Sequence, residues 1–260
     1  MKYKVILFDA DETLFDFKKA EREAFKNTMI DFGVDYDENY HFNTYEKINS
    51  AIWKELEQGL ITQEKLKTER FKRFIDKIDM SFDENEFATT YMKYLGDGSF
   101  LFEGARKLIK DLSDKYILSI VTNGLTVVQE RRIKKSSIAK YFKDIVISEE
   151  IGIAKPHPDI FEHAIGNLGE FNKDEILMIG DNLSSDIKGG INYNIDTCWY
   201  NPNKKEHKSD LSPTYEMSDY KELNACFYDS CILYPEPPVR IPPQHLFHSI
   251  WFCDIVIITF

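Results

Sequence analysis

The chain has 260 residues, 43% of them apolar, which is enough for one large folded domain or two small ones. Its formal net charge is −11, from 33 basic and 44 acidic residues, and this argues against non-specific binding to nucleic acid, which needs a basic face. No apolar run approaches the roughly 18 to 20 residues of a membrane span, and the short apolar run before Asp9 does not resemble a signal peptide.

Cysteine usage indicates the cellular compartment. Four cysteines lie in the last third of the chain and form no CxxC pair: Cys198, Cys226, Cys231 and Cys253. We interpret them as reduced thiols and expect a cytoplasmic protein without a membrane or nucleic-acid partner. The sequence does not indicate an oligomeric state.

Short apolar runs recur along the chain, and each is typical of a strand that is buried on both faces of a parallel sheet. The predicted strands are residues 5–8, 117–121, 145–147, 176–179 and 197–200, with 215–217 as a further short strand. The predicted helices between them are residues 104–115, 127–139, 158–169 and 184–191. This alternation predicts an α/β fold with a doubly wound parallel sheet.

Residues 16–97 interrupt this alternation with amphipathic helical patterns and no good strand. We expect an insertion of about four helices there, and Ser81 with Glu84 has the spacing of a capping box that opens a last helix through Tyr94. Because the insertion leaves the sheet directly after the first strand, we interpret it as a lid over the site. A separate helical domain with no role at the site is the alternative.

The last segment, residues 224–260, differs from the rest. Five prolines fall within residues 235–243, and an apolar run follows from Ile250. It could be an added strand, a partner-binding segment or a non-native read-through, and we favour the last. The predicted organisation is therefore a core of residues 1–15 and 98–223, a helical cap of 16–97 and an atypical tail.

Polar residues suited to phosphate chemistry follow four of the apolar runs. The carboxyl ends of parallel strands converge on one crevice, so we expect these side chains to meet there. They are Asp9 and Asp11, then Thr122, Asn123 and Gly124, then Lys155 before Pro156, and finally Asp181 and Asp186.

The acidic residues of this set predict a metal site. In an extended backbone Asp9 and Asp11 would point to the same side. Two carboxylates about 4 Å apart repel by about 4 kcal/mol at an effective dielectric constant of 20, and a hard dication removes that cost. Mg²⁺ is the simplest explanation, since it binds one or two carboxylates together with phosphate.

The same residues could carry phosphoryl transfer. One carboxylate can accept the phosphoryl group as an acyl phosphate, and a second can protonate the leaving alcohol and then deprotonate water. Asp9 and Asp11 could divide these roles. The groups that could contact phosphate are the Thr122 hydroxyl, the Asn123 amide, the Gly124 backbone and the Lys155 ammonium.

Taken together, the segments Asp9-x-Asp11-x-Thr13-Leu14, Thr122-Asn123-Gly124, Lys155-Pro156 and Gly180-Asp181-x4-Asp186 resemble the four motifs of the haloacid dehalogenase superfamily, over residues 1 to about 222. The resemblance implies a Rossmann-like core and a helical cap of subfamily I. It also implies a phosphoryl acceptor at Asp9, a general acid/base at Asp11, a motif-two hydroxyl at Thr122 and a motif-three lysine at Lys155. Mg²⁺ would be held by Asp9, the backbone carbonyl of Asp11 and Asp181, with Asp186 as a further ligand or an orienting carboxylate.

One departure from the superfamily pattern is informative. Most members have glycine where this chain has Glu12, and the stretch from Asp9 to Phe17 is similar to the branch that dephosphorylates pyrimidine nucleoside 5′-monophosphates. Phe15, Phe17 and cap aromatics such as Trp53 could offer a surface on which a flat base stacks. The expected partner is therefore a small phosphorylated metabolite, namely a nucleotide.

Three alternatives remain open at this stage. True haloacid dehalogenases generally lack the second acid, so Asp11 favours phosphate chemistry over carbon–halogen chemistry. Sugar-phosphate phosphatases and β-phosphoglucomutases share all four motifs and differ in the cap. An inactive scaffold on the same fold would be expected to lack Asp9, Asp11 or Lys155, and all three are present.

Overall fold

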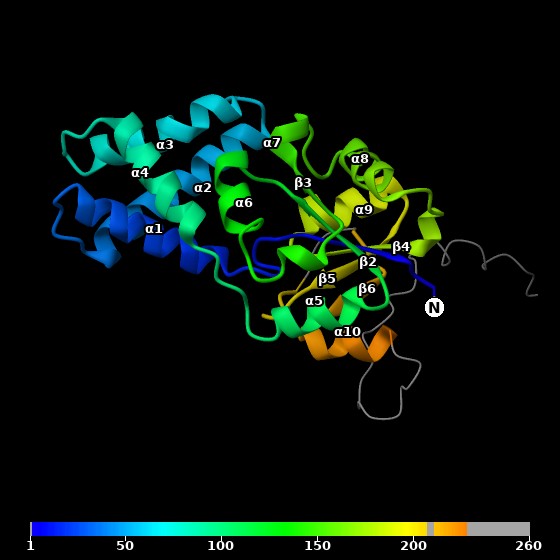
Figure 1. Cartoon of the computed structure of the whole chain (residues 1–260). Coiled ribbons are helices and arrows are strands. Elements are labelled where there is room, and N and C mark those ends of the chain that lie inside the picture. Colours follow the sequence, from blue (N-terminus) through cyan, green and yellow to red (C-terminus); the bar gives the residue numbers. More distant parts are fainter. Residues whose placement is uncertain (1, 207–210, 228–260) are drawn as a thin grey trace, which may run out of the picture.

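The computed structural model describes residues 2–206 and 211–227 of the chain (Figure 1). Its centre is a parallel sheet in the order β3-β2-β1-β4-β5-β6. The strands are β1 (Val5–Phe8), β2 (Ile117–Thr122), β3 (Asp144–Ile147), β4 (Ile176–Gly180), β5 (Asp196–Tyr200) and β6 (Tyr215–Met217). The prediction of a Rossmann-like parallel sheet is confirmed, and the strand order reverses between β1 and β4.

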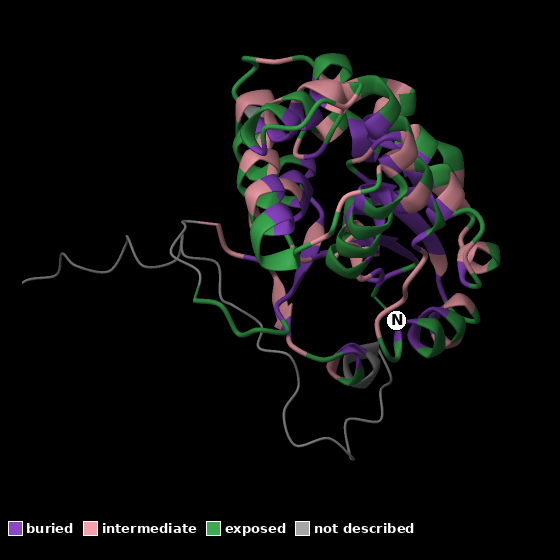
Figure 2. Ribbon diagram, turned by 90° about the vertical axis from the view of Figure 1, so that its left-hand side faces the viewer, coloured by how far each residue is buried: buried purple, intermediate pink, exposed green. Residues whose placement is uncertain are grey.

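Helices cover both faces of this sheet (Figure 1). They are α5 (Ala105–Ser113), α8 (Pro158–Leu168), α9 (Lys188–Tyr193) and α10 (Tyr220–Phe227), while α6 (Thr126–Arg132) and the short α7 (Ser148–Ile151) follow the ends of β2 and β3. Side chains alternate along β1, so Ile6 and Phe8 join the core under α5 and α10, while Val5 and Leu7 join the core under α8. Figure 2 shows the buried residues along the strands and on the inner faces of the helices.

Two predicted helices differ from the observed ones. The helix predicted for 127–139 ends at Arg132, and a turn leads to a 3₁₀ helix at Ala139–Tyr141. Ile133 and Ile138 are both fully buried, and a continuous helix would not place residues five apart on one face. The helix predicted for 184–191 begins as a π-helical segment, Leu183–Ile187, and continues as α9.

The inserted segment forms the expected four helices, which pack beyond the carboxyl end of the sheet (Figure 1). They are α1 (Phe17–Asp31), α2 (Asn43–Glu57), α3 (Gln63–Lys77) and α4 (Glu84–Asp97), with a π-helical turn at Glu38–Phe42 before α2. The capping box predicted at Ser81 is wrong. Asp83 caps α4 instead, because its side chain accepts hydrogen bonds from the backbone N–H groups of Asn85 and Glu86, both at 2.9 Å.

Aromatic side chains form the core of the cap. Phe25 of α1 stacks on Tyr45 at 4.5 Å between ring centroids and meets the edge of Phe74 at 5.0 Å. The same cluster includes Leu125 and Val128, which belong to the α6 region of the core domain. The cap is therefore packed directly on α6.

Two adjacent stretches of chain attach the cap to the sheet. The backbone N–H of Asp16 donates to the carbonyl of Phe100 at 2.9 Å, and Phe102 donates to Leu14 at 3.0 Å. A Cβ at Gly98 would lie 2.8 Å from the Cβ of Ala20, so glycine permits this close approach. Both connections thus lie at the carboxyl end of β1.

Three further sequence predictions concern a membrane span, the C-terminal tail and the cysteines. Among the described residues, no helix combines the length and the apolar character needed to cross a membrane. Helix α10 continues to Phe227, past the predicted core boundary at residue 223, and residues 228–260 of the predicted tail lie outside the described residues. Cys198 on β5 is buried, and the side chains of the other three cysteines lie outside the description.

Candidate active site

The predicted site residues gather where the strand order reverses. Asp9 follows β1 and Asp181 follows its neighbour β4, so the two carboxylates leave adjacent strands at the same edge of the sheet. Thr122 ends β2 on the other side of β1. Parallel pairing therefore brings together segments that lie more than a hundred residues apart in the sequence.

Asp9 lies in a nearly closed environment with 7% of its surface exposed. Its Oδ1 accepts a hydrogen bond from Lys155 Nζ at 2.6 Å, and its Oδ2 accepts one from Thr13 Oγ1 at 3.4 Å. Burial raises the pKa of Asp9 to about 6, and the adjacent Lys155 ammonium opposes that shift. Lys155 holds one oxygen, and the other accepts only the long hydrogen bond from Thr13, so this second oxygen is suited to nucleophilic attack.

The Lys155 ammonium contacts three oxygen acceptors, one of which is Asp9. Its ammonium donates to the carbonyl of Val121 at 2.6 Å and to Asp186 Oδ1 at 2.8 Å, besides Asp9. Burial disfavours its charge, but Asp186 and Asp9 outweigh that effect and raise the pKa of Lys155 above its usual value. The lysine therefore stays protonated beside the nucleophile.

Asn123 holds the backbone of this lysine. Its side-chain amide donates to the carbonyl of Lys155 at 2.9 Å and accepts from the Lys155 N–H at 2.9 Å. The sequence suggested that Asn123 contacts phosphate, whereas the structure uses both ends of its amide to position Lys155.

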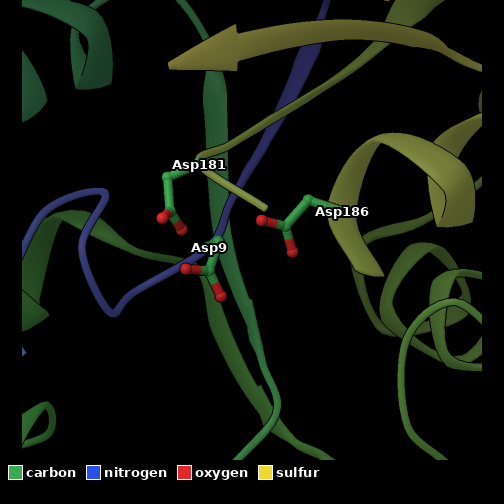
Figure 3. Close-up of side chains that lie close together, drawn as sticks. All are labelled: Asp9, Asp181 and Asp186. Atoms are coloured by element: carbon green, nitrogen blue, oxygen red, sulfur yellow. The ribbon is translucent and has the colours of Figure 1, made fainter. Parts of the chain in front are cut away.

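Three carboxylates form a compact acidic cluster. Asp9, Asp181 and Asp186 offer oxygens that all lie within 4.8 Å of one another (Figure 3). Burial, followed by the negative charges of Asp9 and Asp186, raises the pKa of Asp181 to about 8. Mutual repulsion of this kind disappears when a dication binds, and an all-oxygen ligand set suits Mg²⁺. The donor set thus fits the predicted metal.

Neighbouring groups hold the cluster in place. Asp186 Oδ2 accepts from the Asn182 N–H at 2.9 Å, and a Cβ at Gly180 would collide with the same carboxylate. The Trp199 indole donates to the carbonyl of Asp181 at 2.9 Å. Gly180 is therefore required by the close packing of Asp186, which the sequence motif alone does not explain.

A tight turn follows Asp11. The carbonyl of Ala10 accepts from both Leu14 and Phe15, at 2.9 Å each, and Glu12 has a positive φ of 61°. The chain thus turns directly after Asp11, over residues 12–14, and the Asp11 carboxylate is bonded to α6. The prediction that Asp9 and Asp11 point to the same side of an extended backbone stays a prediction. The expected contact between the Asp11 backbone carbonyl and Mg²⁺ stays a prediction.

Two side chains of α6 donate hydrogen bonds to the Asp11 carboxylate. Arg132 Nη2 donates to Asp11 Oδ1, and Gln129 Nε2 donates to Asp11 Oδ2 at 2.8 Å. Gln129 Nε2 also donates to Thr122 Oγ1 at 3.2 Å. A Cβ at Gly124 would lie 2.6 Å from Gln129 Nε2, so this glycine makes room for Gln129.

Sequence reasoning missed Gln129 and Arg132. The available signal was their i, i+3 spacing on the helix that follows Thr122, which puts both on one helix face. A fully buried arginine is rare unless it is paired, and Arg132 is fully buried. Burial lowers the pKa of Arg132 to about 10, which leaves it charged at neutral pH.

The two phenylalanines proposed for base stacking have other contacts. Phe15 is fully buried in the sheet core, and Phe17 is partly buried at the start of α1. The Arg132 guanidinium lies 5.3 Å from the Phe15 ring centroid and 5.1 Å from that of Phe17. The two rings thus pack against the Arg132 guanidinium. Phe15 is fully buried and has no exposed face on which a base could stack.

A pocket opens beside Asp181 at the boundary with the cap. Its wall includes Glu12, Lys18 of α1, Trp199 and the loop of residues 201–203 with Lys205. The Lys18 ammonium pairs with Glu12 Oε2 at 2.9 Å. Glu12, which stands where most superfamily members have glycine, therefore links the nucleophile loop to the first cap helix.

Comparison with known proteins agrees with this geometry. A family model described as haloacid dehalogenase-like hydrolase matches residues 3–194. Pyrimidine 5′-nucleotidase PynA of Streptococcus pneumoniae is 37% identical over 227 residues, which cover 87% of this chain and 95% of that protein. Pyrimidine 5′-nucleotidase YjjG of Escherichia coli is 31% identical, covering 86% of this chain and 97% of its own length.

A solved structure shows the same similarity in three dimensions. The crystal structure of HAD-hydrolase YfnB of Bacillus subtilis, bound to magnesium and described as revealing interdomain movement, superposes with a TM-score of 0.81 at 33% identity. The match covers 87% of this chain and 99% of that one. By sequence and by structure, this chain belongs to the haloacid dehalogenase-like hydrolases.

Proposed function

We propose that the protein is a Mg²⁺-dependent phosphomonoesterase that hydrolyses pyrimidine nucleoside 5′-monophosphates through a phosphorylated Asp9. The observation that carries the proposal is the pair Asp9 and Asp11, whose carboxylates have different partners. Asp9 lies against Lys155 beside the acidic cluster, whereas Asp11 is held by Gln129 and Arg132 of α6. Two carboxylates in different environments can divide the roles of nucleophile and general acid/base.

The first chemical step transfers the phosphoryl group to the protein. An oxygen of Asp9 attacks phosphorus, and the bond between phosphorus and the ester oxygen breaks. Asp11 gives a proton to the departing alkoxide, which leaves as the nucleoside. Lys155, already within 2.6 Å of Asp9, balances negative charge on the nucleophile and the phosphate.

The second step restores the enzyme. Asp11, now ionised, takes a proton from a water molecule whose oxygen attacks phosphorus. The bond between phosphorus and the Asp9 oxygen breaks, which releases inorganic phosphate and regenerates both carboxyl groups. Asp9, Asp181 and Asp186 would hold Mg²⁺, which when bound neutralises the charge of the carboxylates and the phosphate.

Asp11 also separates phosphate chemistry from dehalogenation. A halide leaves as a stable anion and needs no proton, whereas the alkoxide of a phosphate ester is a poor leaving group without one. A carboxylate held towards the site by two side chains therefore supports a leaving group that is an alcohol.

The nucleotide part of the proposal rests on the relatives. PynA and YjjG, both named pyrimidine 5′-nucleotidases, align over nearly their whole length, including the cap. The base would contact the cap, where Trp53 of α2 is partly buried and Lys18 lines the pocket beside Asp181. A cytoplasmic location stays a prediction.

A substrate panel tests the proposal. Phosphate release is measured with Mg²⁺ on dUMP, UMP, dTMP, GMP, hexose phosphates and p-nitrophenyl phosphate, with EDTA as the control. Preference for the pyrimidine monophosphates supports the nucleotidase assignment. Preference for hexose phosphates would change the proposed substrate class and leave the proposed phosphoryl-transfer mechanism in place. If folded protein released phosphate from none of these esters, the proposed function would be overturned.

The metal site makes a separate prediction about pH. Protons and Mg²⁺ compete for the same carboxylates, and the pKa values of Asp9 and Asp181 are raised to about 6 and about 8. Mg²⁺ affinity is therefore expected to increase as the pH rises from below 6 to above 8. Calorimetric titration in two buffers of different ionisation enthalpy measures the affinity and the protons released. An affinity that does not change over this range would contradict the proposed ligands.

A further inference from the structure

We propose that Arg132, together with Gln129, is a positioning residue that orients Asp11 for proton transfer; this inference rests on the proposed function. Neither residue belongs to the four motifs from which the site was predicted. Both lie on α6, at positions that share one helix face, and both are almost fully enclosed, with 0% and 2% of their surfaces exposed.

The two side chains together occupy both oxygens of the Asp11 carboxylate. Arg132 Nη2 donates to Oδ1, and Gln129 Nε2 donates to Oδ2 at 2.8 Å. Arg132 Nη2 also donates to Gln129 Oε1 at 2.9 Å, so the two donors are joined to each other. Accepting at both oxygens describes the ionised carboxylate that takes the proton from water in the second step, and it fixes the side-chain rotamer that proton transfer in either direction requires.

Gln129 extends this network to the phosphate site. Its Nε2 lies within hydrogen-bond distance of both Asp11 Oδ2 and Thr122 Oγ1, at 2.8 and 3.2 Å. The distance between the acid/base and the predicted phosphate-binding hydroxyl is therefore set by one amide group. Gly124 leaves the space that this amide needs.

Arg132 is itself held at the two connections to the cap. Its guanidinium lies on the rings of Phe15 and Phe17, which flank the first connection. Its backbone carbonyl accepts from Ser99 Oγ, in the second connection, at 2.7 Å. The guanidinium thus packs on two rings and the backbone of Arg132 is held separately, so Asp11 is bonded to a group that has little freedom to move.

One nitrogen of this guanidinium donates all of its side-chain hydrogen bonds within the described part of the chain. Nε and Nη1 are buried and have no hydrogen-bond partner among the described residues, whereas Nη2 serves both Asp11 and Gln129. Burying a cation costs several kcal/mol unless a partner compensates it. Asp11 forms the ion pair with Arg132 here, and the charge of Asp9 also favours the protonated guanidinium, so the pair is a specific buried contact and not a general surface attraction.

A purely structural role for Arg132 would also predict damage on mutation, so the test needs a readout that stability does not change. The ratio of kcat/KM for two substrates is independent of the fraction of folded enzyme. The best alkyl phosphate from the substrate panel has a leaving group that needs a proton. The p-nitrophenolate of p-nitrophenyl phosphate leaves readily without one.

Arg132→Met and Gln129→Met are measured on both substrates in the full-length protein. For each variant kcat/KM is expected to fall at least about tenfold more for the alkyl phosphate than for p-nitrophenyl phosphate, because general acid catalysis contributes about 10²- to 10⁴-fold and is needed mainly by the poorer leaving group. Arg132→Lys keeps the charge and is expected to recover part of the lost ratio. Arg131→Gln, one residue away and paired with Asp97 at 2.5 Å on the surface, is the matched control.

The outcomes separate the inference from the proposed function. Equal losses on both substrates for either methionine variant would overturn the positioning role and leave Arg132 as a packing residue. If Arg132→Met does not fold, Gln129→Met and Arg132→Lys decide the question by the same ratio. A wild-type enzyme that hydrolyses neither ester would instead overturn the proposed function.

Discussion

Asp9→Asn is expected to lower phosphatase turnover by at least about 10⁴-fold, the order of loss seen when a nucleophile is removed from an assembled site. An amide oxygen is a poor phosphoryl acceptor, and the change also removes one of the three carboxylates of the acidic cluster. The measurement is phosphate release from the best substrate, combined with a search for the hydroxylamine-sensitive phosphoryl group on wild-type protein during turnover.

Folding of this variant is checked independently. Lys155 keeps its ion pair with Asp186 at 2.8 Å, so the Asp9→Asn protein is expected to remain folded. Asp159→Asn on α8 has the same chemical change at an exposed position and is the matched control. Appreciable turnover by folded Asp9→Asn protein would remove Asp9 from the nucleophile role.

Lys155→Met is expected to reduce both activity and stability. The lysine is 4% exposed, and its removal leaves Asp9, Asp186 and the carbonyl of Val121 without their shared donor. Breaking a buried ion pair by removing one partner typically costs about 3–5 kcal/mol. Urea unfolding of the variant without Mg²⁺ is therefore expected to show a loss of about this size at neutral pH.

The pH dependence of that loss identifies its cause. With Lys155 present the pKa of Asp9 is raised to about 6, and since Lys155 lowers this pKa, its removal raises the pKa of Asp9 further, so that the variant takes up a proton on Asp9 above pH 6. The difference in unfolding free energy between wild type and variant is therefore expected to shrink as the pH falls from neutral towards about 6 and to change little below that value. Mg²⁺ is expected to reduce the same difference at neutral pH, since a bound cation offsets the carboxylates.

A surface lysine provides the comparison. Lys134→Met removes an ammonium that is 43% exposed and paired with Glu130 at 2.9 Å, and exposed pairs contribute about 0–1 kcal/mol. If Lys155→Met also lost only about 0–1 kcal/mol of unfolding free energy, the buried ion pair would not be what stabilises this site.

The architecture of the sheet could be predicted from the sequence for a physical reason. A strand covered by helices on both faces is apolar at every position, so Val5–Phe8 and Ile176–Ile179 are visible as uninterrupted runs. Parallel strands end at one edge, and polar residues directly after such runs therefore identify the crevice. Asp9, Lys155, Asp181 and Asp186 were recognisable because each follows this rule or a motif of the superfamily.

Residues that act through tertiary contacts were not recognisable in the same way. Gln129 and Arg132 are a glutamine and an arginine on a short helix, and such residues usually face water. Only the packing of α6 against the cap connections encloses them and directs them to Asp11. The end of α6 at Arg132 has the same origin, because the burial of Ile133 and Ile138 outweighs the helical pattern.

The sequence by itself thus determined the fold class, the helical insertion and the acidic and basic groups at the strand ends, since periodicity and position after a strand are local properties of the chain. The tertiary structure decided where those groups point. The bonding of Asp11 to α6, the full burial of Phe15 and the bonding of the Asn123 amide to Lys155 depend on segments that meet only in space. Side-chain direction at such meetings is set by packing and hydrogen-bond satisfaction across the fold, which no local pattern encodes.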